Sequence, residues 1–154
     1  EFVYDHPFQW GSKRTGPDLA RDGGNPNIKK SNWWHYQHLI RPKSISQGSI
    51  MPAYTWLDEN DLDISLISKK INAMRTLGVP YKKGYENLAE ADLEKQALEI
   101  ATDIIMSQNP NVLKRINVKQ KISELKKKEI VALIAYLQRL GKDVMVTDLP
   151  QSTK

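Results

Sequence analysis

One methionine stands in a setting that suits metal ligation. The segment QGSIMPAYTW, residues 47–56, places Met51 between a Gly/Ser turn and a proline, with two aromatic residues close behind it. Pro52 favours an extended backbone at the preceding residue, and Tyr54 and Trp56 can wall off an apolar niche. A thioether held in this way is a soft, neutral ligand for a haem iron or for copper(I). On the local pattern alone, a methionine that simply fills the core of a loop explains the segment better.

A second pair of possible ligands is weaker. His35 and His38 lie three residues apart in WWHYQHL, and on a helix this spacing brings both imidazoles to one face, as a metal site requires. No third ligand of suitable spacing accompanies them. A structural role for the two histidines is therefore favoured.

A cluster of carboxylates follows Trp56. We expect these acids to occupy the first turn of a helix, where the helix dipole favours negative charge. They therefore need no calcium ion to explain them, although a calcium site stays an open alternative. The residues are Asp58, Glu59, Asp61 and Asp63.

Composition restricts the chemistry further. The 154 residues are 40% hydrophobic and 27% charged, which is typical of one soluble domain. The sequence contains no cysteine, so these residues form no disulfide, thiolate metal site or thioether bond to haem. No run is apolar enough for a membrane span. Because the chain starts at Glu1 rather than at a methionine, we expect it to be a piece of a longer protein, with any anchor upstream.

The positive charge is concentrated near the carboxyl end. The net charge is +5, and residues 112–154 carry ten basic and four acidic side chains. The run KRINVKQKISELKKKE could contact phosphates in a nucleic acid. No aromatic residue is interleaved with it and no nucleic-acid motif surrounds it, so a solvated linker and helix face is the preferred interpretation.

Periodicity predicts the elements that must position these groups. Residues 1–56 are rich in Gly, Pro, Asn and Trp, which is typical of loops with at most short helices. A helix of about four turns is expected within ENDLDISLISKKINAMRTLGVP, before the stop residues Gly78 and Pro80. Its apolar stripe is Ile64, Ile67, Ile71 and Met74. We expect Met74, Met106 and Met145 to be ordinary core residues.

Two further helices are predicted downstream. The segment NLAEADLEKQALEIATDIIMSQNP opens with Asn87 three residues before Glu90, which resembles a capping box, and Pro110 ends it. Its stripe is Leu93, Ala97, Ile100, Ala101 and Ile104. The strongest pattern is KKEIVALIAYLQRLGK, which closes with Gly141 as a C-cap. Its stripe is Ile130, Leu133, Ile134, Leu137 and Leu140.

Long strings around Met51 identify a family. EFVYDHPFQWGSKRTGPDLARDGG, followed by WHYQHLIRPKSISQGSIMPAYTWL, closely resembles the mono-haem cytochrome c subunit, CcoO or FixO, of the cbb-type (C-family) haem-copper cytochrome c oxidases. The resemblance covers residues 1–57, resumes at RTLGVPY and returns at ALIAYLQRLG. Residues 84–125 do not match the pattern, and we expect them to be a lineage-specific elaboration.

The resemblance implies a haem pocket of the class I cytochrome c type. In that family the methionine of the MPAY segment, here Met51, is the distal axial ligand of a c-type haem. The backbone carbonyl of the proline in GPDL, here Pro17, accepts the Nδ1 hydrogen of the proximal histidine, which fixes that ring. Leu19 would pack on the haem face, and Gly16 opens the same segment. The expected neighbours of the haem edge or propionates are Trp10, Arg14 and Trp34.

One part of the family pattern is missing. A CxxCH segment, which supplies two thioether bonds and the proximal histidine, does not occur in these residues. None of His6, His35 and His38 follows a CxxC pair, so none qualifies as the proximal ligand. In the family this segment lies upstream of position 1. We therefore expect a fragment that binds no haem by itself, although the intact subunit carries haem c.

The resemblance implies an all-α, class I cytochrome c-like domain with long loops and an inserted helical region. We expect haem-pocket loops with the axial methionine at residues 1–57 and a helical insertion at 58–125. The family's C-terminal helix would occupy 126–142, and a tail 143–154. The chain would perform no bond chemistry itself, because its groups only tune the haem.

The expected function is electron transfer in a terminal oxidase. Electrons would come from another cytochrome c subunit or a soluble cytochrome c and pass to the catalytic haem-copper subunit that reduces dioxygen. The expected location is the periplasmic face of the bacterial inner membrane, reached through an anchor outside these residues or through the complex, and no nucleic acid is expected as a partner. The alternative is a haem-free helical binding module that uses the basic C-terminal third to recognise a partner.

Overall fold

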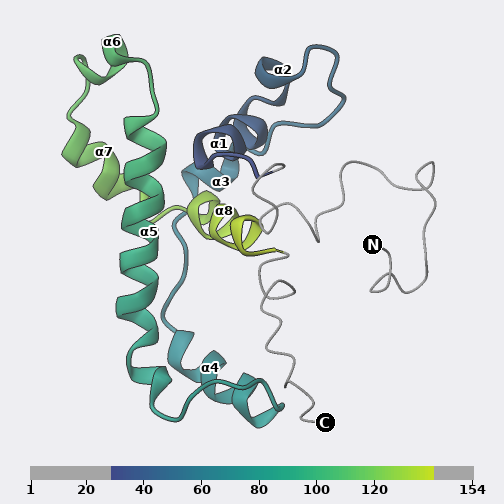
Figure 1. The fold of residues 1–154 in the computed structure, drawn as a ribbon, viewed down its shortest axis with the longest axis vertical. Helices are drawn as coiled ribbons and strands as arrows, with labels where there is room; N and C mark the ends of the chain where they lie inside the picture. Colours follow the sequence, from purple (N-terminus) through teal and green to yellow (C-terminus); the bar gives the residue numbers. More distant parts are fainter. Residues whose placement is uncertain (1–28, 141–154) are drawn as a thin grey trace, which may run out of the picture. The chain divides into compact units, whose positions relative to one another are not determined.

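The backbone is helical in the computed structural model, which describes residues 29–140 (Figure 1). Those residues contain no β-strand, in agreement with the predicted all-α fold. Residues Lys30–Tyr136 form one compact unit, which is described below. The elements are α1 (Asn32–Ile40), α2 (Pro42–Ile45), α3 (Trp56–Glu59), α4 (Ile67–Thr76), the 3₁₀ helix η3 (Tyr85–Asn87), α5 (Ala89–Met106), α6 (Pro110–Leu113), α7 (Val118–Leu125) and α8 (Glu129–Arg139).

The core lies where α5 meets α8. Ile104 of α5 and Ile130 and Ile134 of α8 are completely buried, and α7 and α1 add Leu125 and Leu39 to the same cluster. These isoleucines belong to the stripes predicted from periodicity, so the two predicted helices that correspond to α5 and α8, with their inward faces, are confirmed.

Helix α1 is fixed at both its start and its side. The Ser31 Oγ atom accepts the Trp34 backbone N–H at 3.1 Å, which caps the helix. The Asn32 side chain donates to the Asp103 carboxylate at 2.9 Å, which ties α1 to α5. With nine residues, α1 is longer than the loop-rich composition of this region suggests, because a serine cap and aromatic packing stabilise it.

The end of α3 is pinned to the start of α8. Leu62 N–H donates to the carbonyl of Lys127 at 2.8 Å, and Glu129 N–H donates to the carbonyl of Asn60 at 3.1 Å. The Lys128 ammonium reaches the Asp61 carboxylate at 2.8 Å. These contacts follow α3 directly, where Asn60 is extended and Asp61 forms an isolated antiparallel bridge with Lys128.

The helix of about four turns predicted within residues 59–80 is therefore wrong at its start, where Asp61 and Asp63 were expected in the first turn. Asp58 and Glu59 do lie in the first turn of a helix, but that helix is the four-residue α3, and α4 starts only at Ile67. Asp61 pairs with Lys128 instead, and the Asp63 carboxylate accepts the Ser65 N–H at 2.9 Å. Such local side-chain bonds compete with helical ones.

Three smaller predictions also need correction. Asn87 does not cap α5, because it lies in η3 and the N-cap residue is Leu88, which offers no side-chain acceptor. Pro110 does not end α5 but opens α6. Met74 and Met106 are 43% and 57% exposed, so they are not core residues; Met145 and Gly141 lie outside the described residues.

Helix α4 ends as predicted at Gly78. This glycine has φ +93°, and its N–H donates to the carbonyl of Arg75. The following residue, Val79, donates to the carbonyl of Met74 at 3.0 Å. This pair of bonds is a Schellman motif, which needs a left-handed residue at the position that glycine occupies.

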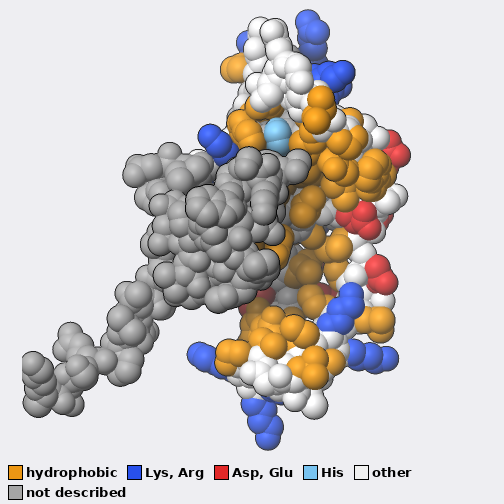
Figure 2. Space-filling view, turned by 90° about the vertical axis from the view of Figure 1, so that its right-hand side faces the viewer, with side chains coloured by type: hydrophobic (Ala, Val, Ile, Leu, Met, Phe, Trp, Pro, Cys, Tyr) orange, Lys and Arg blue, Asp and Glu red, His pale blue; other side chains and the backbone are white. Residues whose placement is uncertain are grey.

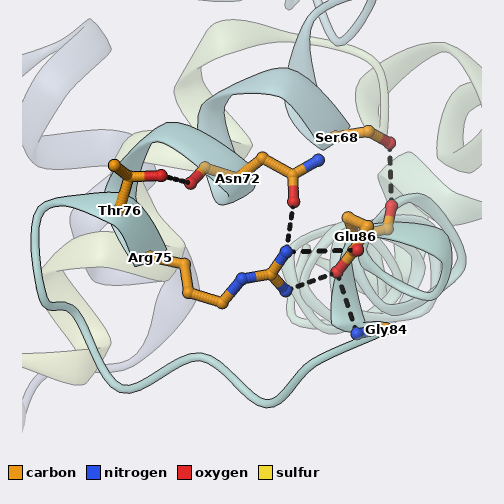
Figure 3. Close-up of polar contacts among 6 residues, drawn as sticks. All are labelled: Ser68, Asn72, Arg75, Thr76, Gly84 and Glu86. Atoms are coloured by element: carbon orange, nitrogen blue, oxygen red, sulfur yellow. Dashed lines mark hydrogen bonds and ion pairs between the residues drawn. The ribbon is translucent and has the colours of Figure 1, made fainter.

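A cluster of polar contacts joins α4 to η3 (Figure 3). The Arg75 guanidinium donates to both Glu86 carboxylate oxygens, at 2.8 and 3.3 Å, and Gly84 N–H donates to the same carboxylate at 3.0 Å. The Ser68 hydroxyl donates to the Glu86 backbone carbonyl at 2.8 Å. Two-pronged arginine contacts of this kind fix orientation as well as distance.

We expect the Glu86 carboxyl to titrate far below its ordinary range. Hydrogen bonds from Arg75, then from backbone N–H groups, lower its pKa to about 2. A carboxyl whose pKa is lower in the folded state than in the unfolded state stabilises the fold at pH values above its unfolded-state pKa. This contribution disappears as the pH falls through the folded-state pKa of about 2. Carboxyl-resolved NMR titration measures the pKa directly.

An Arg75→Gln substitution should return the Glu86 pKa towards the ordinary glutamate value, because it removes the largest cause of the shift. Lys121→Gln provides the control, since Lys121 pairs with Glu124 instead. If Glu86 of the unsubstituted protein titrates like an exposed glutamate, the lowered pKa that we attribute to Arg75 is wrong.

Within residues 29–140, no helix combines the length and the apolar character needed to cross a bilayer.

Candidate functional site

The loop that carries Met51 is anchored at both ends. Gly48, with φ +80°, forms the turn, and the Met51 N–H donates to the Ser49 Oγ atom at 3.2 Å. After Pro52 the chain returns to α1, where Tyr54 N–H donates to the carbonyl of Leu39 at 2.9 Å. A loop tied in this way holds its side chains in place without a helix or strand.

This geometry separates two neighbouring apolar side chains. Ile50 is 98% exposed, whereas Met51 is half-buried and packs against the core cluster. The extended backbone before a proline turns successive side chains to opposite sides. The thioether is therefore the apolar group of the loop that faces inward.

The two aromatic residues that follow Met51 differ in their burial. Tyr54 packs against the core and meets Trp56 edge to face, with ring centroids 5.1 Å apart. Trp56 itself is 48% exposed. Tyr54 therefore faces the core, while Trp56 contacts Tyr54 and stays partly in contact with solvent.

Both histidines of the described region lie on α1. His35 is 4% exposed, and His38 stacks on Trp34 with ring centroids 4.5 Å apart. Trp34 also meets His35 edge-on at 5.3 Å, and the Lys30 ammonium lies 5.6 Å from its ring centroid. Figure 2 shows a histidine surrounded by hydrophobic side chains in the upper part of the molecule.

The donor chemistry of this region fits a haem better than a bare metal ion. Across residues 29–140, no group of three or more His, Cys, Asp or Glu side chains is placed to hold a metal. A single neutral thioether in an apolar, aromatic setting is instead what one axial position of a haem iron takes. Met51 would hold the iron. Of the other predicted pocket residues, the structure describes only Trp34. The remaining predicted pocket residues lie outside the described residues, as does His6: Trp10, Arg14, Gly16, Pro17 and Leu19.

The acidic cluster does not converge on one point. Asp61 and Asp63 have lowered pKa values because of hydrogen bonds from Lys128 and Ser65 respectively. Asp58 accepts a hydrogen bond from the Tyr36 hydroxyl at 3.1 Å. Since Asp58, Asp61 and Asp63 each have a different partner, their arrangement gives no support to a calcium site.

The Tyr36–Asp58 pair is a feature that the sequence did not reveal. Burial, followed by the charge of Asp58, raises the Tyr36 pKa well above the ordinary value. The pair borders a pocket of about 290 Å³ that α7 lines with Lys121 and Glu124. The two residues are separated by 22 positions, and no periodic pattern links positions so far apart across a loop.

Three lysines of the basic C-terminal third form ion pairs within the chain. Lys121 pairs with Glu124 at 3.1 Å, Lys126 lies 3.7 Å from Glu94, and Lys128 contacts Asp61. Much of the run forms α7 with Ile122 and Leu125 turned towards the core. The run includes an exposed helix face of the kind predicted, since Lys119 and Lys121 of α7 are exposed.

The comparison with known families gives one match. A family model described as cytochrome C oxidase, mono-heme subunit/FixO matches residues 1–144. The search of curated proteins returned no match. The matched residues include the whole Met51 loop, α1 and the helices of the core.

Proposed function

The chain belongs to the family of mono-haem cytochrome c oxidase subunits, and from this premise we propose that Met51 is the distal axial ligand of a c-type haem through which the protein passes electrons to the catalytic subunit. Membership gives the chain an electron-transfer role within a membrane-associated oxidase complex. It also makes a c-type haem the cofactor of the family and a catalytic subunit its partner.

The setting of Met51 is the observation that carries the proposal. Its side chain is half-buried and packs on the core, while the next apolar residue, Ile50, points to solvent. The Tyr54–Leu39 hydrogen bond fixes the loop on α1, so little further ordering is needed when the thioether binds iron. Preorganisation of a ligand on a rigid support is what a site of fixed geometry requires.

The chain's own groups would tune the site rather than react in it. When bound, the haem iron supplies the one-electron oxidation and reduction. Met51 would favour the ferrous state, and the aromatic side chains around its loop would keep water away from the thioether. The Pro17 carbonyl would orient the proximal histidine, and Leu19 would cover the haem face.

We propose the following organisation along the chain. Residues 1–57 form the haem-pocket loops, 58–125 the helical insertion, 126–142 the C-terminal helix and 143–154 a tail. Electrons would enter from another cytochrome c at the periplasmic face and leave towards the haem-copper subunit that reduces dioxygen. The helix α8 lies within the proposed C-terminal helix and provides two completely buried residues of the core.

Covalent haem attachment tests the assignment. Residues 1–154 contain no cysteine, so the CxxCH segment that forms thioether bonds would have to lie outside them. We expect no covalent haem on residues 1–154 produced with a c-type maturation system, and one haem per chain on a protein extended upstream through a CxxCH segment. A pyridine haemochrome assay measures both.

The extended protein with both cysteines changed to serine is the control, and it should lose the covalent haem while its expression level stays the same. Covalent haem on residues 1–154 would contradict the proposed site. So would an extended protein that stays without haem under conditions in which a known c-type cytochrome matures.

A further inference from the structure

The lower lobe of the described part presents an apolar helix face to solvent. We define the α4 lobe as residues 66–88, which comprise α4, η3 and the loop between them. Positions 66, 73, 74 and 77 fall on one side of α4 at helical spacing. Leu77 is 79% exposed, Leu66 45% and Met74 43%, and Leu88 after η3 is 60% exposed.

This outward orientation is enforced from the other side of the helix. Ile67 and Ile71 are half-buried, and Ser68 and Arg75 bond to Glu86 (Figure 3). Ser68 and Arg75 therefore lie on the side of α4 that faces η3. Because the bidentate Arg75 contact fixes the helix about its own axis, α4 cannot rotate to bury its apolar outward face without breaking the contact.

Exposed lysines accompany the apolar side chains. Lys70 lies within the apolar stripe and Lys69 beside it, and Lys82 and Lys83 follow in the loop before η3; all four are exposed. Figure 2 shows hydrophobic side chains together with Lys and Arg side chains on this lower lobe. The lobe also holds a stacked tyrosine pair, Tyr81 and Tyr85, with centroids 5.6 Å apart.

We propose that the α4 lobe docks on an anionic lipid surface. Interfacial helices combine an apolar face that enters the head-group region with lysines that contact lipid phosphates. Long lysine side chains suit this role because their stems cover apolar surface while the ammonium stays in water. Tyrosine is enriched at the same depth of a bilayer.

Two observations favour lipid over a protein partner. Cores of protein–protein interfaces are depleted in lysine, whereas Lys70 lies inside the apolar stripe of this lobe. The family is also associated with a membrane oxidase complex, which places the chain close to a bilayer. The contact goes beyond the proposed electron transfer and does not depend on haem.

Vesicle flotation of residues 1–154 tests the proposal. We expect binding to vesicles of phosphatidylcholine with about one-third phosphatidylglycerol, and much weaker binding to phosphatidylcholine alone. Met74→Gln with Leu77→Gln should weaken partitioning about ten-fold or more, because two exposed apolar side chains no longer enter the interface. Lys69→Gln with Lys70→Gln should weaken partitioning to anionic vesicles about five-fold per lysine and reduce the dependence of this partitioning on salt.

The matched control is Leu98→Gln with Met106→Gln, because both residues are exposed apolar positions of α5 outside the lobe. This control should bind vesicles like the natural chain. An equal loss of vesicle binding in the control and in the lobe variant would overturn the proposal. The proposal would also be overturned if the unsubstituted chain did not bind anionic vesicles. A lobe variant that changes the oligomeric state in sedimentation but not vesicle binding would identify a protein contact and also overturn it.

A second measurement leaves most of the face intact. The chain has no cysteine, so Leu77→Cys accepts a single environment-sensitive fluorophore, and Leu98→Cys provides the reference position. Adding anionic vesicles should shift the emission of the Leu77 label to shorter wavelength and leave the Leu98 label unchanged. The same emission shift at both positions, or at neither, would overturn the proposal.

Discussion

Met51→Ala is expected to abolish the long-wavelength sulfur-to-iron absorption band of the ferric protein after haem is attached through an upstream CxxCH segment. The midpoint potential should also fall, on the order of 0.1 V, because an axial thioether favours ferrous iron and axial ligands control much of the range of haem potentials. Absorption spectroscopy and a spectroelectrochemical titration measure the two effects. Neither readout depends on turnover of the oxidase.

Met74→Leu and Met106→Leu are matched controls for this experiment. Both methionines are substantially exposed, and the exchange keeps the side-chain volume nearly the same. Each should leave the band and the potential unchanged. If Met74→Leu and Met51→Ala alter the spectrum equally, Met51 is not the ligand.

Ile134→Ala should cause a large loss of stability. Its side chain is completely buried where α8 meets α5, and removing buried methylene groups costs the transfer free energy plus that of the cavity left behind. We expect the free energy of unfolding to fall by about 2 to 5 kcal/mol, which is a large fraction of the total for a typical domain. Chemical denaturation followed by far-UV circular dichroism measures the change.

Two comparisons make the stability prediction specific. Ile134→Val should cost about 0.5 to 1.5 kcal/mol, since it removes one buried methyl group. Leu98→Ala, at a position that is 48% exposed, should cost less than Ile134→Ala. A denaturation midpoint for Ile134→Ala that equals the one for Leu98→Ala would show that the α5–α8 contact does not form the core.

Local periodicity was sufficient for the helices that build the core. Ala101 and Ile104 in α5, and Ile130 and Ile134 in α8, were predicted on inward faces and are completely buried. Long stripes of apolar residues at spacings of three and four leave few alternatives for burial. The stop at Gly78 was predictable for a similar reason, because its conformation is one that few other residues adopt.

Long-range contacts explain where the prediction was wrong. Asp61 and Asp63 were expected in a helix, but residues 59–62 bond across more than sixty positions to the start of α8. Nothing within the local window indicates that bond. The same limit applies to Met74, whose spacing groups it with Ile67 and Ile71 although it is 43% exposed and they are half-buried.

By itself, the sequence determined the all-α class, the family and the one thioether set in a loop, because these depend on residue types and short spacings. The tertiary structure decided which apolar faces are buried. It left Met51 half-buried and Ile50 exposed in a loop that the Tyr54–Leu39 hydrogen bond ties to α1, and it left Met74 exposed while Ile67 and Ile71 of the same predicted stripe are half-buried. The physical reason is that an apolar stripe indicates only that a helix has an apolar side. Which part of the protein covers that side depends on contacts between residues far apart in the chain.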